Sequence, residues 1–232
     1  MVREERKTAS IAVVFDMDGV LFDTERLITD CWMQLAKEEG LLRMQEVMET
    51  CIGTNTADTI QILKKEYGEN FDVAFFLEKT SFLFHQFIKE HGVPVKKGVY
   101  ELLSYLKQEE VPTALASSTK EKSVLSHLEQ TKIRSYFKVI VCGDMVKHSK
   151  PDPEIYCRAC EGLGVLPKDV YAVEDSFHGI TSAYRAGIKP IMVPDLIKPT
   201  EEIRTLTTAV FSDLLEVKEF FSELIKKEGE RK

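Results

Sequence analysis

The sequence lacks any hydrophobic run long enough to cross a membrane. None of its apolar stretches approaches the roughly 20 residues that a spanning helix needs. Residues 1–10 are rich in charge, and no apolar region follows them that could make a signal peptide. We therefore expect a cytoplasmic protein that has no membrane partner.

Cysteine is scarce, and its pattern does not suggest disulfides. The chain holds five cysteines, an odd number, and they are scattered along its length. Cys157 and Cys160 have the spacing of half a zinc site, but no second pair of ligands accompanies them. We interpret these two residues as packing residues of an amphipathic helix, because reduced cysteine behaves as a small hydrophobe.

An excess of positive charge is also missing. The formal net charge is −7, which argues against a nucleic-acid partner, because phosphate backbones are bound by clustered Lys and Arg. An acidic protein can still bind a small anion where a metal ion and local donors reverse the field. With 44% hydrophobic and 30% charged residues, the composition is that of a folded protein of enzyme size.

Short apolar runs alternate with helical periodicities through most of the chain. This alternation is typical of βαβ units, in which helices cover both faces of a parallel sheet. We predict an α/β fold, a Rossmann-like doubly wound parallel sheet. The predicted strands are 11–15, 111–116, 139–142, 170–173 and 190–193.

A long insertion separates the first two predicted strands. About 95 residues lie between them, where a simple crossover needs only about a dozen. The insertion shows helical spacing only, at 27–40, 44–51, 56–67 and 72–91. We predict a catalytic core of residues 1–22 and 96–232 and a small helical domain of residues 23–95. The aromatic cluster Phe75, Phe76, Phe82, Phe84 and Phe87 is expected to form that domain's core, and the alternative is that part of it faces a substrate.

Polar side chains follow the ends of four predicted strands. The carboxyl ends of parallel strands meet at one edge of the sheet, where open α/β sheets bind their ligands. Carboxylates buried together there need a cation, and Mg²⁺ prefers oxygen ligands. A surface turn, or part of a calcium loop, would also explain an Asp-x-Asp-Gly sequence taken alone. The residues concerned are Asp16, Asp18, Ser117, Lys150, Glu174 and Asp175.

Four motifs in this order resemble the haloacid dehalogenase-like hydrolase superfamily, in its β-phosphoglucomutase and phosphatase-like branch. They are Asp16-Met17-Asp18-Gly19, Ser117, Lys150 and Glu174-Asp175. The helical insertion resembles the family's small cap domain, and the resemblance covers essentially the whole chain. Such caps close over the site and contact the leaving group of the substrate.

The resemblance implies roles for the charged residues. Asp16 would attack phosphorus to form an aspartyl-phosphate, and Asp18 would act as general acid and then as general base. Asp16 and Asp175 would bind Mg²⁺ directly, together with the backbone carbonyl of Asp18. Glu174 would bind the same metal directly or through one of its ligands. Lys150 would offset charge between the nucleophile and the phosphoryl group.

The remaining predicted site residues would bind the substrate. Ser117 and the backbone N–H groups of Ser118 and Gly19 would hold phosphoryl oxygens. In the cap, Gly53 and Asn55 fall where relatives place a specificity loop. Each assignment has a simpler alternative: Ser117 could merely cap a helix, and Lys150 could be a solvated loop lysine. His178 could border the site or simply occupy the first turn of a helix.

The resemblance leaves the reaction open between phosphatase and mutase. β-Phosphoglucomutases usually carry an Arg in the cap loop, whereas this chain has Thr54, Asn55 and Thr56. The second aspartate, Asp18, disfavours a dehalogenase, and nothing marks a cap lysine for phosphonate hydrolysis. We therefore expect a phosphatase of a sugar phosphate or nucleoside monophosphate. A sugar phosphomutase and a non-catalytic metabolite-binding protein are the alternatives. We expect a monomer, with a dimer as the alternative.

Overall fold

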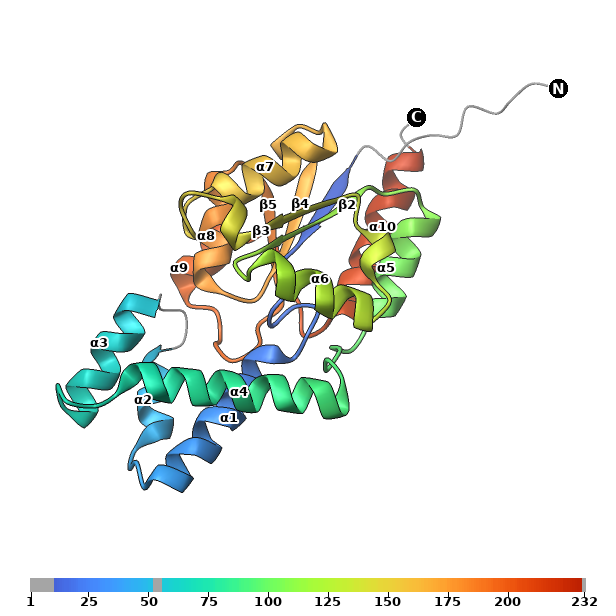
Figure 1. The fold of residues 1–232 in the computed structure, drawn as a ribbon. Coiled ribbons are helices and arrows are strands. Elements are labelled where there is room, and N and C mark those ends of the chain that lie inside the picture. The colour runs from blue at the N-terminus through green and yellow to red at the C-terminus, as the bar shows by residue number, and fades with distance from the viewer. Residues whose placement is uncertain (1–10, 52–55, 231–232) are drawn as a thin grey trace. The chain divides into compact units, whose positions relative to one another are not determined.

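The computed structural model describes residues 11–51 and 56–230. These residues divide into two compact units (Figure 1). The larger unit combines the described residues up to Leu21 with those from Val95 onward, and the smaller unit is Phe22–Pro94. Within the described ranges, no helix combines the length and the hydropathy that crossing a bilayer requires.

A six-stranded parallel sheet forms the centre of the larger unit and confirms the predicted fold class. Its strand order is β3-β2-β1-β4-β5-β6, so that β1 lies between β2 and β4. Val14 of β1 pairs with Ala114 on one side and with Ala172 on the other. The strands are β1 Ala12–Phe15, β2 Thr113–Ser117, β3 Val139–Cys142, β4 Val170–Glu174, β5 Lys189–Met192 and β6 Ala209–Val210.

Four of the five predicted strands have bounds that differ by one or two residues from those of the structure, and one strand was not predicted. β2 begins at Thr113 rather than at residue 111, because Pro112 has no N–H to donate to a neighbouring strand. Its carbonyl still accepts a hydrogen bond from the backbone N–H of Val13. The two-residue strand β6 was not predicted, because a segment of that length carries no periodicity.

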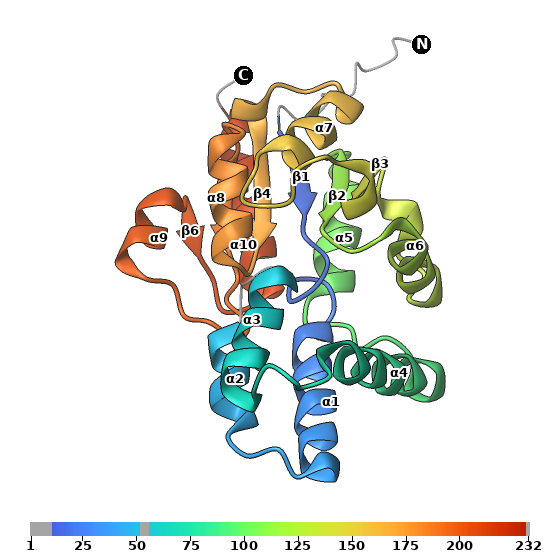
Figure 2. The ribbon, with the colours of Figure 1, turned by 60° about the vertical axis from the view of Figure 1, so that its left-hand side comes forward.

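Helices cover both faces of the sheet (Figures 1 and 2). α5 (Val99–Gln108) packs against α10 (Leu214–Glu230) on one face. Two helices lie on the other face. α7 (Glu154–Leu163) covers β2 and β3, and α8 (Phe177–Arg185) covers β4 and β5. The unit also contains α6 (Glu121–Gln130), α9 (Glu201–Leu206) and three 3₁₀ turns, Arg134–Tyr136, Gly143–Met145 and Pro167–Asp169.

Helix α7 shows how the sequence sets the packing. Ile155, Tyr156, Ala159 and Cys160 recur at helical spacing and are buried against the sheet. The helix ends at Gly164, whose φ of 70° suits a residue without a Cβ. Both cysteines of this helix are free thiols, and Cys160 lies in the hydrophobic core.

The described residues of the smaller unit form four helices close to the predicted ranges. They are α1 (Thr24–Glu39), α2 (Met44–Cys51), α3 (Thr56–Tyr67) and α4 (Val73–His91). Its core centres on Trp32 and Phe76, whose rings meet edge to face with centroids 5.1 Å apart.

The predicted aromatic core of this unit is wrong for three residues. Phe76 is buried and Phe84 is half-buried, but Phe75, Phe82 and Phe87 are exposed. The reason is the helical period of α4. Its buried positions include Val73, Phe76 and Thr80, and Phe75 and Phe82 project from another side of the helix.

Candidate active site

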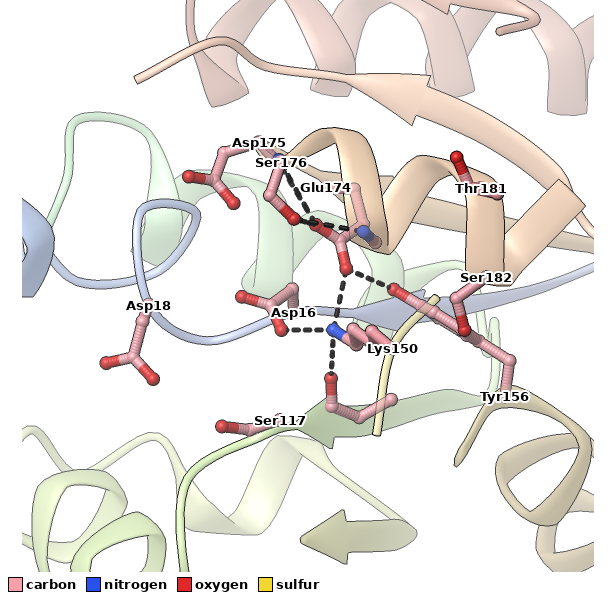
Figure 3. A network of polar contacts seen from close by, with 12 residues as sticks. Asp16, Asp18, Ser117, Lys150, Tyr156, Glu174, Asp175, Ser176, Thr181 and Ser182 are labelled. Atoms are coloured by element: carbon pink, nitrogen blue, oxygen red, sulfur yellow. Dashed lines mark hydrogen bonds and ion pairs between the residues drawn. The ribbon is translucent and has the colours of Figure 1, made fainter. Parts of the chain in front are cut away.

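The carboxyl end of the sheet gathers charged residues from three separate segments. Asp16 directly follows the central strand β1, Glu174 ends the adjacent strand β4, and Lys150 lies in the loop before α7 (Figure 3). Asp16, Glu174 and Asp175 each offer a carboxylate oxygen, and these oxygens lie within 4.8 Å of one another. Residues far apart in the sequence therefore form one buried acidic cluster.

Lys150 is the cation of this cluster. Its Nζ donates to Asp16 Oδ1 at 2.5 Å and to Glu174 Oε1 at 2.6 Å. The third ammonium hydrogen has an acceptor in the carbonyl of Ala116, 3.0 Å away. Burial by itself lowers the pKa of Lys150, but the two carboxylates outweigh burial and raise that pKa. The side chain is 7% exposed, so this residue is not a solvated loop lysine.

Asp16 is in an environment that opposes its ionisation. Burial raises the pKa of its carboxyl well above the ordinary value, Lys150 lowers it, and the neighbouring acids Glu174 and Asp18 raise it further. If Asp16, Glu174 and Asp175 are all ionised, three carboxylates face one ammonium and two negative charges remain. A divalent cation with oxygen ligands, such as Mg²⁺, matches this donor set in both chemistry and charge.

Glu174 is fully buried, and protein donors occupy both of its carboxylate oxygens. Oε1 accepts from Lys150 and from the Tyr156 hydroxyl, the latter at 2.7 Å. Oε2 accepts from the Asp175 backbone N–H and the Ser176 hydroxyl, both at 3.2 Å. Gly179 makes room for this carboxylate, because a Cβ there would lie 1.9 Å from Glu174 Cδ.

Asp175 approaches the backbone of the loop that follows β1. Gly19 in that loop has a φ of 79°, and a Cβ on it would lie 2.2 Å from Asp175 Oδ2. Glycine meets both demands, the left-handed backbone and the close approach. Asp175 is only 9% exposed, so its carboxylate faces the cluster rather than bulk water.

Asp18 is separate from the acidic cluster. Its side chain points away from Asp16 (Figure 3). Its Oδ2 accepts a hydrogen bond of 2.8 Å from the Thr119 hydroxyl. The carboxylate of Asp18 is not part of the group of close oxygens formed by Asp16, Glu174 and Asp175. That Asp18 offers a metal only its backbone carbonyl stays a prediction.

Ser117, Ser118 and Thr119 lie at and just after the end of β2, and the sequence did not show which contacts each of them makes. Ser117 is the last residue of β2 and is fully buried, and its Oγ accepts from the Thr119 N–H at 3.1 Å. The next helix, α6, is capped by Lys120, so Ser117 is not its N-cap. Ser118 is exposed, and its carbonyl lies so close to Gly143 that a Cβ there would be 2.0 Å away.

Two contacts of the site could not be found from the sequence. Thr119 holds Asp18, and the only signal for it was its place in a run of three hydroxyl residues after a strand. Tyr156 holds Glu174, but its helical spacing marked it only as a packing residue. His178 lies exposed on the first turn of α8. Gly53 and Asn55 fall outside the described residues.

Comparison with known proteins identifies the family. A family model described as "Haloacid dehalogenase-like hydrolase" matches residues 13–193. The chain belongs to this family. It is 37% identical over 185 residues to the "Phosphorylated carbohydrates phosphatase" of Thermotoga maritima, covering 78% of this chain and 83% of the relative. It is 30% identical over 211 residues to the "Probable pseudouridine-5'-phosphatase" of Drosophila melanogaster, covering 88% and 90%.

Solved structures of the family share this fold. A haloacid dehalogenase family hydrolase from Deinococcus radiodurans, with bound phosphate and sodium, has a TM-score of 0.77 and 25% identity, covering 93% of this chain and 96% of the other. The CbbY protein of Rhodobacter sphaeroides, in complex with phosphate, has a TM-score of 0.71 and 25% identity, covering 89% and 95%. With the named phosphatases among its relatives, this haloacid dehalogenase-like hydrolase is a phosphoric monoester hydrolase.

Proposed function

We propose that this hydrolase is a Mg²⁺-dependent phosphatase of a small phosphorylated metabolite, a sugar phosphate or a nucleoside monophosphate. The observation that carries the proposal is the contact between Lys150 and Asp16 inside a cluster of three buried carboxylates. An anionic nucleophile with an ammonium partner and neighbouring carboxylates that suit a divalent cation would favour attack on a phosphate ester. The named activities of the relatives from Thermotoga and Drosophila support this substrate class.

Asp16 is the proposed nucleophile, and Asp18 the proposed acid and base. A carboxylate oxygen of Asp16 bonds to phosphorus while the bond from phosphorus to the ester oxygen breaks and Asp18 gives that oxygen a proton. Asp18 then takes a proton from water as the water oxygen bonds to phosphorus and the bond from phosphorus to the Asp16 carboxylate oxygen breaks. Inorganic phosphate leaves, and both carboxyl groups return to their starting states.

Mg²⁺ would be held by the carboxylates of Asp16 and Asp175 and by the backbone carbonyl of Asp18. When bound, it supplies positive charge to the phosphoryl oxygens and to the crowded carboxylates. We place Glu174 outside the direct ligands, because donors from Lys150, Tyr156, Asp175 and Ser176 already use both of its oxygens. Its role in this proposal is to hold Lys150 against Asp16.

The proposed phosphoryl-binding groups come from the ends of β1 and β2. Ser117 ends β2 beside the carbonyl of Ala116 that Lys150 contacts, and Gly19 approaches Asp175. We assign the Ser117 hydroxyl and the N–H groups of Ser118 and Gly19 to the phosphoryl oxygens. Gly53 and Asn55 stay predicted contacts of the leaving group, as does the cap role of the helical insertion.

Two alternatives predict different results. The absence of Arg among Thr54, Asn55 and Thr56 disfavours a mutase, and the complete buried ionic cluster disfavours a protein that only binds metabolites. The test incubates the purified protein with hexose phosphates, pentose phosphates and nucleoside monophosphates, with Mg²⁺ or with EDTA. We expect release of inorganic phosphate that stops with EDTA and returns with added Mg²⁺.

The same assay separates the alternatives. Conversion of a hexose 1-phosphate to a hexose 6-phosphate without release of phosphate would establish the mutase. No turnover of any substrate by folded, metal-loaded protein, including para-nitrophenyl phosphate, would favour the binding protein. The role of residues 23–95 in selecting the substrate is tested by mutations confined to that segment, which should change the substrate preference.

A further inference from the structure

Tyr156 contacts both ions that hold the proposed nucleophile in place. Its hydroxyl donates to Glu174 Oε1 at 2.7 Å, and the Lys150 Nζ lies 5.1 Å from the centre of its ring. The residue is fully buried, on the helix that begins four residues after Lys150. Figure 3 shows its hydroxyl directed at Glu174, on the side away from Asp18.

We propose that Tyr156 is a positioning residue that acts through Glu174 to keep the Lys150 ammonium on Asp16. It touches neither the proposed substrate nor the reacting oxygens. Its effect passes along one chain of contacts, from the hydroxyl to Glu174 Oε1, from there to Lys150 Nζ and on to Asp16 Oδ1. The kinetic part of this inference rests on the proposed function.

The hydroxyl matters because Lys150 divides its hydrogen bonds between two carboxylates. Its ammonium is 2.5 Å from Asp16 and 2.6 Å from Glu174, so the two acids compete for it nearly equally. A second donor on Glu174 Oε1 takes up part of that oxygen's negative charge, which weakens its pull on the lysine. Without the hydroxyl, Lys150 would move toward Glu174 and away from Asp16.

A purely structural role for Tyr156 makes a different prediction. The ring fills space in the core beside Ile155 and Cys160, and phenylalanine would fill it equally well. A phenylalanine would also keep the ring beneath the Lys150 ammonium. Tyr156→Phe therefore removes the hydrogen bond to Glu174 and leaves the packing in place.

Tyr136 provides a matched control in the same unit. Its hydroxyl lies 3.1 Å from the Ser104 hydroxyl, and the Lys107 Nζ lies 5.3 Å from its ring centre. Tyr136→Phe thus removes a tyrosine hydroxyl beside a lysine outside the acidic cluster. Comparing the two variants separates the effect on kcat of removing any tyrosine hydroxyl from the effect of removing the hydrogen bond to Glu174.

The first experiment measures kcat and KM of the Mg²⁺-loaded variants with para-nitrophenyl phosphate. We expect Tyr156→Phe to lower kcat roughly tenfold, at the lower end of what losing a hydrogen bond to a charged group causes, and to change KM less than about twofold. Tyr136→Phe should match the wild type. A kcat for Tyr156→Phe equal to that of the control would overturn the inference.

A double-mutant cycle tests whether Tyr156 acts through Glu174. In the Glu174→Gln background, adding Tyr156→Phe should change kcat by less than about twofold, because the affected carboxylate is already absent. Two independent effects that multiply in the double variant would show that Tyr156 does not act along this chain of contacts.

A second measurement does not depend on turnover. The Lys150 ammonium, which has three protein acceptors, should give a slowly exchanging NH₃⁺ signal in lysine-selective ¹⁵N NMR, assigned by its loss in Lys150→Arg. Tyr156→Phe should shift this signal and speed its hydrogen exchange several-fold, whereas Tyr136→Phe should not. An unchanged signal in Tyr156→Phe would refute the inference.

Failure of the proposed function can be told apart from failure of this inference. If the wild type has no phosphatase activity, the proposed function fails, but the NMR spectrum still tests whether Tyr156 positions Lys150.

Discussion

The Lys150 ammonium lies 2.5 Å from the Asp16 carboxylate, although the two residues are 134 positions apart in the chain. Each ion lies in a place where burial alone would favour its neutral form. Their contact lowers the pKa of Asp16 and raises that of Lys150, although burial still leaves the Asp16 pKa above its ordinary value. Glu174 on the other side of the ammonium adds a second carboxylate to the pair. A nucleophilic carboxylate and a site for a divalent cation follow from the same arrangement.

Asp16→Asn should abolish turnover. The amide is nearly isosteric with the carboxylate but is a poor nucleophile, so we expect kcat to fall by at least about a thousandfold while the fold persists. Circular dichroism and the melting temperature check the fold, and mass spectrometry excludes deamidation back to aspartate. Substantial metal-dependent activity in the verified Asp16→Asn variant would contradict the proposed nucleophile.

The raised pKa of Asp16 predicts how metal-free stability depends on pH. Below the ordinary Asp pKa of about 3.9, both folded and unfolded chains carry the proton and no difference arises. Between that value and the raised pKa of Asp16 in the folded state, the folded chain keeps a proton that the unfolded chain has lost. The Asp16 contribution to stability therefore falls as pH rises through this window.

The measurement compares wild type with Asp16→Asn in EDTA, because both share the other titrating groups. The melting temperature of the wild type should fall relative to that of Asp16→Asn as pH rises from about 4 toward neutrality. Added Mg²⁺ should remove most of this difference, since it binds the ionised carboxylate. A constant difference across this range would show that Asp16 is not held at a raised pKa.

Thr119→Val should impair the proposed acid and base step. The Thr119 hydroxyl donates to Asp18 Oδ2 at 2.8 Å, and valine keeps the shape of the side chain but has no donor. We expect kcat to fall roughly tenfold, because the Thr119 hydroxyl no longer orients the Asp18 side chain. Thr119→Ser keeps the hydroxyl and should retain most activity. Equal losses of kcat in Thr119→Val and Thr119→Ser would instead show that Thr119 acts through the packing of its side chain and not through its hydroxyl.

Gly179→Ala should destabilise the protein despite the helical preference of alanine. A Cβ at this position would lie 1.9 Å from Glu174 Cδ, so the buried carboxylate would have to leave its donors. We expect a lower melting temperature and a large loss of kcat. Gly164→Ala is a suitable control, since nothing lies within 4 Å of its added Cβ and only backbone strain of about 1–2 kcal/mol results. A Gly179→Ala protein as stable and active as wild type would contradict the described packing of Glu174.

The parallel sheet and the helices could be predicted because their signals are local. The buried run Ala12–Phe15 and the spacing of Ile155, Ala159 and Cys160 reflect the periods of strands and helices. The residues at strand ends were predictable for a related reason, since parallel strands bring their carboxyl ends to one edge. Asp16, Lys150 and Glu174 do meet there.

Contacts that depend on side-chain direction were beyond the sequence. The exposed Phe82 and the buried Phe76 lie on different sides of one helix, and only packing showed which side is buried. Tyr156 has the same spacing as its buried neighbours, and nothing in that pattern reveals its hydroxyl's partner. Likewise, no local signal told Thr119 apart from Ser117 as the residue that binds Asp18.

The sequence by itself determined the α/β architecture, the helical insertion and the chemical types available at the edge of the sheet. These features depend on local periodicity and on the fixed direction of parallel strands. Only the tertiary structure decided how the charges are shared, with Lys150 between Asp16 and Glu174 and with the Tyr156 hydroxyl on Glu174 Oε1. These contacts depend on the distances between side chains that are far apart in the sequence, and those distances are set only when the chain folds.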